Sequence, residues 1–85
     1  MDKILNLTKL KIGQAGYITN VSGSSKMKTR LLELGFTKGT LVRVINVSSL
    51  KESFLIEVRG YMLALRKNAV GLIDVILNSE REKNE

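Results

Sequence analysis

The chain has 85 residues and a formal net charge of +6, with 44% hydrophobic and 26% charged residues, which is enough for one small domain. It contains no histidine and no cysteine, and this composition excludes disulfides, most transition-metal sites and imidazole acid–base chemistry. We therefore expect that the protein is not an enzyme. The positive charge favours nucleic acid or an acidic protein surface as a partner, although solubility alone also accounts for it.

The N-terminal segment mixes charged and polar residues with apolar ones, so it does not match a secretory signal. No uncharged apolar run approaches the length of about 18 residues that a membrane span needs. We expect a cytoplasmic protein that is not embedded in a membrane. Asn6 and Thr8 are candidate caps for a single helical turn, and Leu7, Leu10 and Ile12 are expected to anchor this segment on the core.

Residues 15–22 are predicted as the first strand, although their alternation is irregular. Tyr17 and Val21 are expected on one face of this strand and Ile18 on the other. A loop of small polar residues then leads to a helix at 26–34.

The predicted helix carries an apolar stripe, because Met27, Leu31 and Leu34 fall at i, i+4 and i+7. Gly35 stands where a left-handed residue often ends a helix, and Phe36 is placed to fold back on Leu31. These positions predict a Schellman cap. This short capped helix lies among strand patterns, and the rest of the chain is organised around it.

Four more strands and one helical turn are predicted after the helix. The strands lie at 40–47, 54–59, 61–66 and 72–77, and the helical turn lies at 67–71. Arg59 and Gly60 are expected to form the tight turn of a hairpin, because glycine accepts the positive φ of such turns. Five short strands, with one helix inserted after the first, predict a mainly β fold that curves into a small barrel.

Basic residues gather on and after the predicted helix. Five basic residues and one acidic residue lie between positions 26 and 43, which gives this segment a net charge of +4. Such a surface favours docking on an acidic protein, while a solvated helix face with an Arg30–Glu33 pair is the simpler explanation. The candidate partner-binding residues are Lys28, Arg30, Leu32, Arg59, Tyr61, Arg66 and Lys67.

Carboxylates are few within the predicted elements. The spacing of Glu33, Glu57 and Asp74 gives no sign that they converge, as a site for ferrous iron or a hard cation would require. We expect no cofactor and no direct iron site.

Several separated motifs together resemble a known family. They are RLLELGF at 30–36 followed by Gly39, VRGY at 58–61, LALRK at 63–67 and IDV at 73–75. From about Leu7 to Val75, this combination resembles FeoA, a family of small cytoplasmic proteins of bacterial ferrous iron transport that is associated with transition metal ions.

The resemblance implies an SH3-like small β-barrel of about five strands at residues 5–77. Residues 78–85 are polar and mixed in charge, and we expect them to form a frayed tail. The resemblance also implies an accessory protein that binds and regulates FeoB, a membrane permease with a cytoplasmic GTPase-like region, and that acts on no small-molecule substrate. FeoA-like domains also resemble the C-terminal domain of iron-dependent repressors. No helix-turn-helix pattern precedes the domain here, so we do not expect a complete repressor.

The chain departs from the usual family pattern at three places. Lys38 stands where proline is common, the loop at 48–53 lacks the usual Gly-Asp-Pro turn, and Asn68 stands where glutamate is frequent. The third departure removes a carboxylate and argues further against a metal site. An exposed Leu32 or an unclosed barrel edge would also allow a homodimer.

The alternative is a barrel that binds nucleic acid. Residues 12–14 and 21–23 loosely resemble the strand–turn pattern of KOW barrels, and the net charge is compatible. The aromatic residues are few, however, and they are not interleaved with basic residues as stacking surfaces require. We therefore favour a protein partner over nucleic acid.

Overall fold

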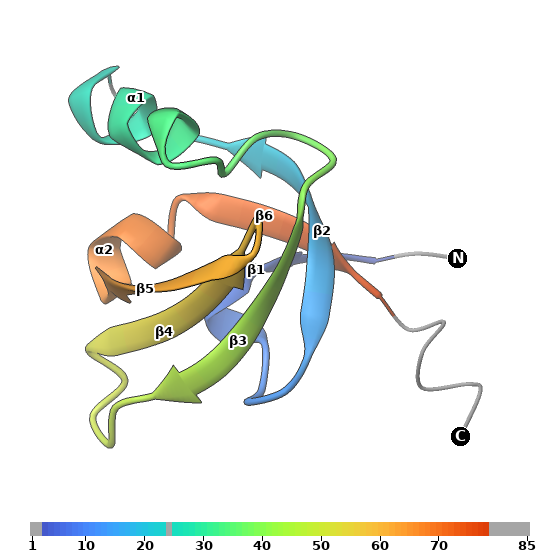
Figure 1. Ribbon diagram of the computed structural model, residues 1–85, viewed down its shortest axis with the longest axis vertical. Helices are drawn as coiled ribbons and strands as arrows, with labels where there is room; N and C mark the ends of the chain where they lie inside the picture. The colour runs from blue at the N-terminus through green and yellow to red at the C-terminus, as the bar shows by residue number, and fades with distance from the viewer. Residues whose placement is uncertain (1–2, 24, 79–85) are drawn as a thin grey trace.

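Six strands form one antiparallel sheet in the computed structural model, which describes residues 3–23 and 25–78 (Figure 1). The elements are β1 (Ile4–Asn6), the 3₁₀ turn η1 (Leu7–Lys9), β2 (Ala15–Val21), α1 (Ser25–Glu33), β3 (Leu41–Val47), β4 (Ser53–Val58), β5 (Tyr61–Arg66), α2 (Lys67–Val70) and β6 (Ile73–Leu77). The strand order in the sheet is β1-β6-β2-β3-β4-β5. The predicted mainly β fold with one inserted helix is confirmed, and each predicted element matches to within one residue at either end.

The sequence analysis missed β1, which makes the sheet six-stranded rather than five-stranded. This strand pairs with β6, so that Ile4 lies opposite Ile76 and Asn6 opposite Asp74. With only three residues, β1 is too short to show an alternation of apolar and polar side chains. β1 is therefore a strand because it pairs with β6, which lies near the other end of the chain.

Asn6 caps the turn that follows β1, as predicted. Its Oδ1 accepts hydrogen bonds from the backbone N and the Oγ1 of Thr8, at 3.2 and 2.6 Å. Its Nδ2 donates to the carbonyl oxygen of Gly71 at 2.8 Å and to Oδ1 of Asp74 at 3.1 Å. One side chain thus joins η1 to β6 and to the end of α2.

Leu7 and Leu10 are buried in the core as expected, but the expectation for Ile12 is wrong, because its side chain is 58% exposed. A tight turn explains this difference. The backbone N of Gln14 donates to the Lys11 carbonyl at 2.9 Å, and the Lys11 N donates to Oε1 of Gln14 at 2.8 Å. Ile12 lies at the tip of this turn and faces solvent.

A β-bulge in β2 overturns the expected faces of that strand. Opposite β6, Ile18 pairs with Val75 and Asn20 pairs with Asp74, so β2 carries one extra residue between the two pairs. Ile18 and Val21 therefore both face the core, although they are three positions apart. Tyr17 does not share a face with Val21, and 45% of its surface is exposed on the outside of the sheet.

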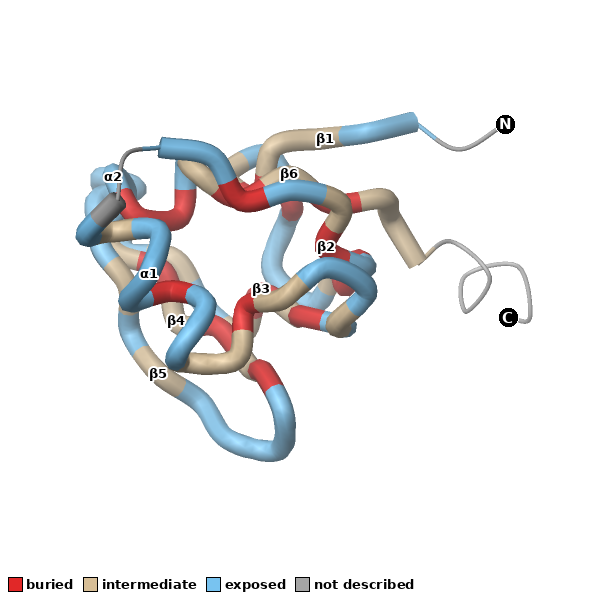
Figure 2. Tube along the Cα trace, turned by 90° about the horizontal axis from the view of Figure 1, so that it is seen from above, coloured by how far each residue is buried: buried red, intermediate tan, exposed pale blue. Residues whose placement is uncertain are grey.

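The curl of the sheet brings its two outer strands towards α2. Among the described residues, β1 and β5 end the hydrogen-bonded ladder, so strand pairing does not close the barrel. The short helix α2 contacts β5 on one side and η1 on the other, and its Ala69 and Val70 are buried. Figure 2 shows the strands arranged around a common interior. None of the described helices has the length and apolar character that a membrane span requires.

Candidate functional site

The end of α1 has the predicted Schellman cap. The backbone N of Phe36 donates to the Leu31 carbonyl at 3.0 Å, and the N of Gly35 donates to the Leu32 carbonyl at 3.1 Å. Gly35 has a φ of +107°, which a residue with a side chain rarely adopts. Phe36 and Leu31 are both buried, so the cap also attaches α1 to the core.

The tip of the β4–β5 hairpin is the predicted two-residue turn. Val58 pairs with Tyr61 across it, and the two turn residues, Arg59 and Gly60, have φ values of 49° and 85°. Positive φ at both positions matches the type I′ turn, which suits the twist of a hairpin. Arg59 holds this backbone conformation although it is not a glycine.

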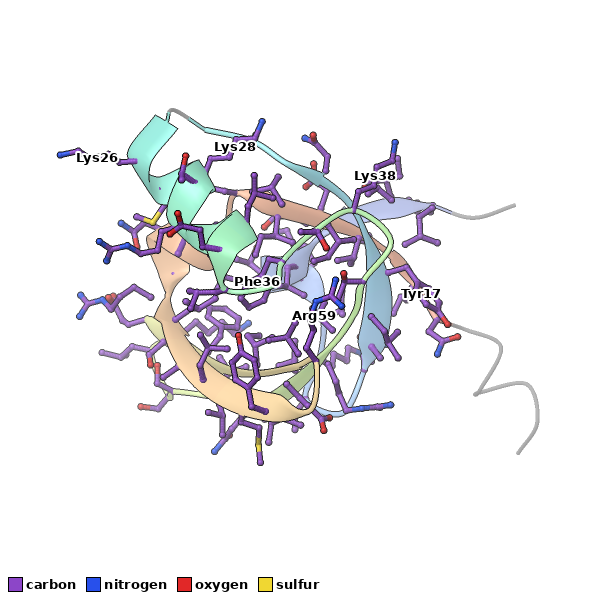
Figure 3. All side chains as sticks on the ribbon, turned by 45° about the horizontal axis from the view of Figure 1, so that its top comes forward. Tyr17, Lys26, Lys28, Phe36, Lys38 and Arg59 are labelled. Carbon is purple, nitrogen blue, oxygen red and sulfur yellow. The ribbon has the colours of Figure 1, made fainter. Side chains whose placement is uncertain are left out.

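Arg59 joins the hairpin tip to the segment after α1 (Figure 3). Its Nε donates to the Gly35 carbonyl at 3.3 Å. Its Nη2 donates to the hydroxyls of Thr37 and Thr40, each at 2.9 Å. The hydroxyl of Tyr61 donates to the Leu34 carbonyl. The two sequence motifs at 30–39 and 58–67 therefore meet in space at the end of α1.

Basic side chains flank α1 on both sides, and none of them forms an ion pair within the described part of the chain. Lys26, Lys28 and Arg30 are exposed, and Leu32, one turn after Lys28, is 39% exposed. Because a helix turns by about 100° per residue, Lys28 and Leu32 lie on one side of α1 and Lys26 and Arg30 on the other. The one ion pair among residues 3–23 and 25–78 joins Nε of Arg43 to Oε1 of Glu57 at 3.8 Å, on a different part of the molecule. The Arg30–Glu33 pair is thus not formed, and the basic side chains of α1 have no acidic partner among the described residues.

The structure separates the predicted partner-binding residues into two groups. Lys28, Arg30, Leu32, Arg59 and Tyr61 lie on α1 or at the hairpin tip beside it, and we call this set the α1 surface. Arg66 and Lys67 lie at the far end of β5, about 17 Å or more along a strand of this length. The second group therefore belongs to another part of the surface.

The lysines near that far end include residues that the sequence analysis did not select. Lys9, Lys11 and Lys51 line the same hollow as Lys67. They come from η1, the loop that follows it and the β3–β4 loop, and about 40 positions separate Lys11 from Lys51 in the sequence. No spacing rule along the chain could have predicted that these loops meet, because their neighbourhood depends on how the sheet curls.

Carboxylates do not gather anywhere in the described residues. No group of three or more Asp, Glu, His or Cys side chains there is placed to hold a metal ion. Asp74 accepts a hydrogen bond from Asn6, and Glu57 pairs with Arg43. The absence of a cofactor and of a direct iron site stays a prediction.

The aromatic side chains do not form a platform for bases within residues 3–23 and 25–78. Phe36 and Phe54 are buried in the core. Tyr17 and Tyr61 are exposed, but they lie on different elements, and the Tyr61 hydroxyl is bonded to the chain itself. This arrangement does not favour single-stranded nucleic acid, whose binding depends on successive stacking surfaces.

The sequence of this chain is similar to those of FeoA proteins. A model of the FeoA domain matches residues 5–77. A Campylobacter jejuni homologue, named as an Fe(2+) transport protein A, is 30% identical over 73 residues, which covers 86% of this chain and 99% of that protein. A Porphyromonas gingivalis fusion of Fe(2+) transport protein A with the Fe(2+) transporter FeoB is 28% identical over 75 residues, which is 88% of this chain but 9% of the fusion.

A solved structure gives the same architecture. The FeoA of Stenotrophomonas maltophilia, described as a prokaryotic SH3 domain protein and complexed with zinc, superposes with a TM-score of 0.70. It is 26% identical, and the match covers 89% of this chain and 88% of that one. The SH3-like fold expected from the motifs is therefore confirmed.

Proposed function

The chain belongs to the FeoA family, and we propose that it is a cytoplasmic accessory protein of ferrous iron uptake that binds and regulates a FeoB permease. The single observation that carries this proposal is the Porphyromonas gingivalis homologue, in which an Fe(2+) transport protein A and FeoB form one polypeptide. Fusion keeps two domains at a high effective concentration, which is useful when they act together.

The α1 surface is the part of the molecule that best suits this contact. Its Lys28 and Arg30 have no acidic partner among the described residues, and Leu32 adds an exposed apolar anchor one helical turn after Lys28. Charges of this kind raise the association rate and orient the partner, while a central apolar side chain slows dissociation. An acidic patch on the cytoplasmic region of FeoB would complement this surface.

Within the α1 surface, Arg59 and Tyr61 position the helix. Their hydrogen bonds to Gly35, Leu34 and two threonines hold the end of α1 against the hairpin tip. The helix is thus presented as a rigid face rather than a mobile one, which lowers the entropic cost of binding. Iron in this account is the cargo of the permease, and we assign no catalytic or iron-binding role to any of the residues that the structure describes.

Calorimetric titration of the purified chain with the cytoplasmic region of FeoB tests the proposal. We expect binding at low salt that weakens as salt screens the charges, together with a change in the rate of GTP hydrolysis by FeoB. Lys28→Glu should weaken binding, while Lys11→Glu, with the same change in charge at the far end of the barrel, should leave it unchanged. An absence of binding at low salt would contradict the proposal.

A further inference from the structure

A basic surface with protruding apolar side chains lies at the end of the barrel opposite α1. Two loops form it, one between η1 and β2 and one between β3 and β4 (Figure 1). Both loops line a hollow of about 680 Å³, together with the start of α2. We call this surface the lysine end, and its charged residues are Lys9, Lys11, Lys51 and Lys67.

The lysine end is strongly positive. All four lysines are exposed, and no acidic side chain lines the hollow with them. Glu52 is the one acidic residue of the two loops, and it lines a neighbouring hollow with Arg66. The positive charge therefore outweighs the negative charge over this whole end of the molecule.

Large apolar side chains project from the same two loops. Leu50 is 79% exposed, which is the highest value among the large hydrophobic residues exposed in the described chain, and Ile12 is 58% exposed. Neither contributes to the core. The exposure of these two large aliphatic side chains does not stabilise the fold, because burying apolar surface away from water is favourable.

Hydrogen bonds hold the two loops in shape. The Lys51 N donates to the Ser48 carbonyl at 2.8 Å, and the Ser48 hydroxyl accepts from the N of Glu52 and of Ser53 at 3.0 and 3.1 Å. In the other loop, the Gly13 N donates to the Val44 carbonyl at 2.7 Å. The apolar tips and their lysines are thus presented in a fixed arrangement.

The backbone of Lys51 adopts a conformation that is unfavourable for lysine. Its φ of 59° lies in the left-handed region, where glycine or asparagine would be more favourable than lysine. A lysine at this position disfavours the fold slightly while placing a positive charge beside Leu50. Such a choice is typical of a position whose side chain serves binding.

We propose that the lysine end docks on the surface of an anionic lipid bilayer. Leu50 and Ile12 would enter the interfacial layer, and the four lysines would bind the acidic headgroups around them, as basic amphipathic surfaces do. The positive charge of the lysine end complements the negative charge of an anionic bilayer. Apolar tips that project from the loops suit a bilayer better than a concave protein pocket. Nucleic acid suits the surface poorly, because Phe54, the aromatic residue of the hollow, is buried.

This contact is independent of FeoB and leaves the α1 surface free. The two surfaces lie at opposite ends of the barrel (Figure 1), so a molecule docked through its lysine end turns α1 away from the bilayer. The attachment is peripheral and weak, because a few lysines and two aliphatic side chains supply much less than a membrane span. It therefore reverses when salt screens the lysines.

Flotation of the full chain with vesicles tests the proposal. We expect binding to vesicles of phosphatidylcholine mixed with phosphatidylserine, and no binding to phosphatidylcholine alone. Removal of each lysine should weaken binding about fivefold, the effect of one basic residue near an anionic surface. Lys51→Gly is a suitable variant, because glycine accepts the positive φ and the variant should fold at least as well as the parent chain.

A charge-matched control separates docking from general attraction. Lys11→Glu and Lys28→Glu change the net charge equally, but Lys28 lies on α1. Lys11→Glu should weaken vesicle binding strongly, and Lys28→Glu should have little effect. Equal losses for the two variants would overturn the proposal.

Fluorescence reports on the apolar tips directly, because the chain contains no tryptophan. The emission of a Leu50→Trp variant should shift to shorter wavelength with the mixed vesicles, while that of Leu32→Trp on α1 should stay unchanged. An unshifted Leu50→Trp emission would overturn the proposal. A larger shift with single-stranded RNA or with a soluble peptide of alternating Glu and Leu would overturn it in favour of that ligand.

Discussion

Arg59 lies directly over Gly35, with its Nε 3.3 Å from the Gly35 carbonyl oxygen. A Cβ added at Gly35 would lie 3.0 Å from Cδ of Arg59. The hairpin tip and the helix cap are therefore fitted to each other across 24 positions of sequence. This contact joins two of the motifs that resemble the family, and it gives both of them a structural role.

Removing the Arg59 side chain should destabilise the fold through lost hydrogen bonds. Arg59 and Lys51 both have positive φ and exposed side chains, but only Arg59 donates side-chain hydrogen bonds within the described residues. Arg59→Ala should lower the free energy of unfolding by about 1–2 kcal/mol more than Lys51→Ala. Urea unfolding of the two variants measures this difference, and equal losses would show that the Arg59 contacts contribute nothing.

Gly35 is expected to tolerate a methyl group poorly for two reasons. Gly35→Ala places a side chain at a φ of +107° and against the aliphatic part of Arg59, whose guanidinium is fixed by hydrogen bonds. Gly39→Ala has a similar φ of +89° but meets no atom within 4 Å. Thermal unfolding should show that Gly35→Ala costs about 1 kcal/mol more than Gly39→Ala. If the two variants have equal stability, Arg59 does not restrict position 35.

Gly16 is required by close approach between strands rather than by its backbone conformation. A Cβ there would lie 2.9 Å from the Ile76 carbonyl oxygen and from Cγ2 of Val75, so β2 and β6 would have to separate. Gly16→Ala should therefore cost about 1–3 kcal/mol. Gly71→Ala is the control, because that position has helical φ and ψ and a Cβ contact of 3.3 Å. Chemical denaturation that finds Gly16→Ala as stable as Gly71→Ala would contradict the packing described for this strand pair.

Addition of Fe²⁺ or Zn²⁺ should leave the unfolding temperature unchanged. The chain has no histidine or cysteine, and carboxylates do not converge within residues 3–23 and 25–78. A bound metal would stabilise the folded state by mass action. Differential scanning calorimetry with each metal and with a chelator measures this, and a metal-dependent rise in the unfolding temperature would reveal a site.

Local patterns allowed much of this fold to be predicted. The helix cap at Gly35 and the hairpin turn at Arg59 and Gly60 each depend on a few adjacent residues, so their conformations follow from residue type. The extra residue in β2 that puts Ile18 and Val21 on the same face has no such local signal, because bulges depend on the partner strand. The same reason explains why β1 was missed.

The candidate surfaces were predicted less completely than the fold. Lys28 and Leu32 could be grouped from helical spacing alone, because they lie four positions apart on one helix. The lysine end draws its side chains from η1, two loops and α2, which only the curl of the sheet brings together. Arg59 and Tyr61 were selected as contact residues, and the structure adds their hydrogen bonds to the end of α1.

Mapping of the contact with FeoB tests the central claim most directly. Backbone amide shifts of the isotope-labelled chain would be followed by NMR while the unlabelled cytoplasmic region of FeoB is added. We predict that the largest changes fall on α1 and on the hairpin tip at Arg59 and Gly60, with little change at the lysine end. Binding that leaves the α1 amides unchanged, or no binding at low salt, would contradict the account.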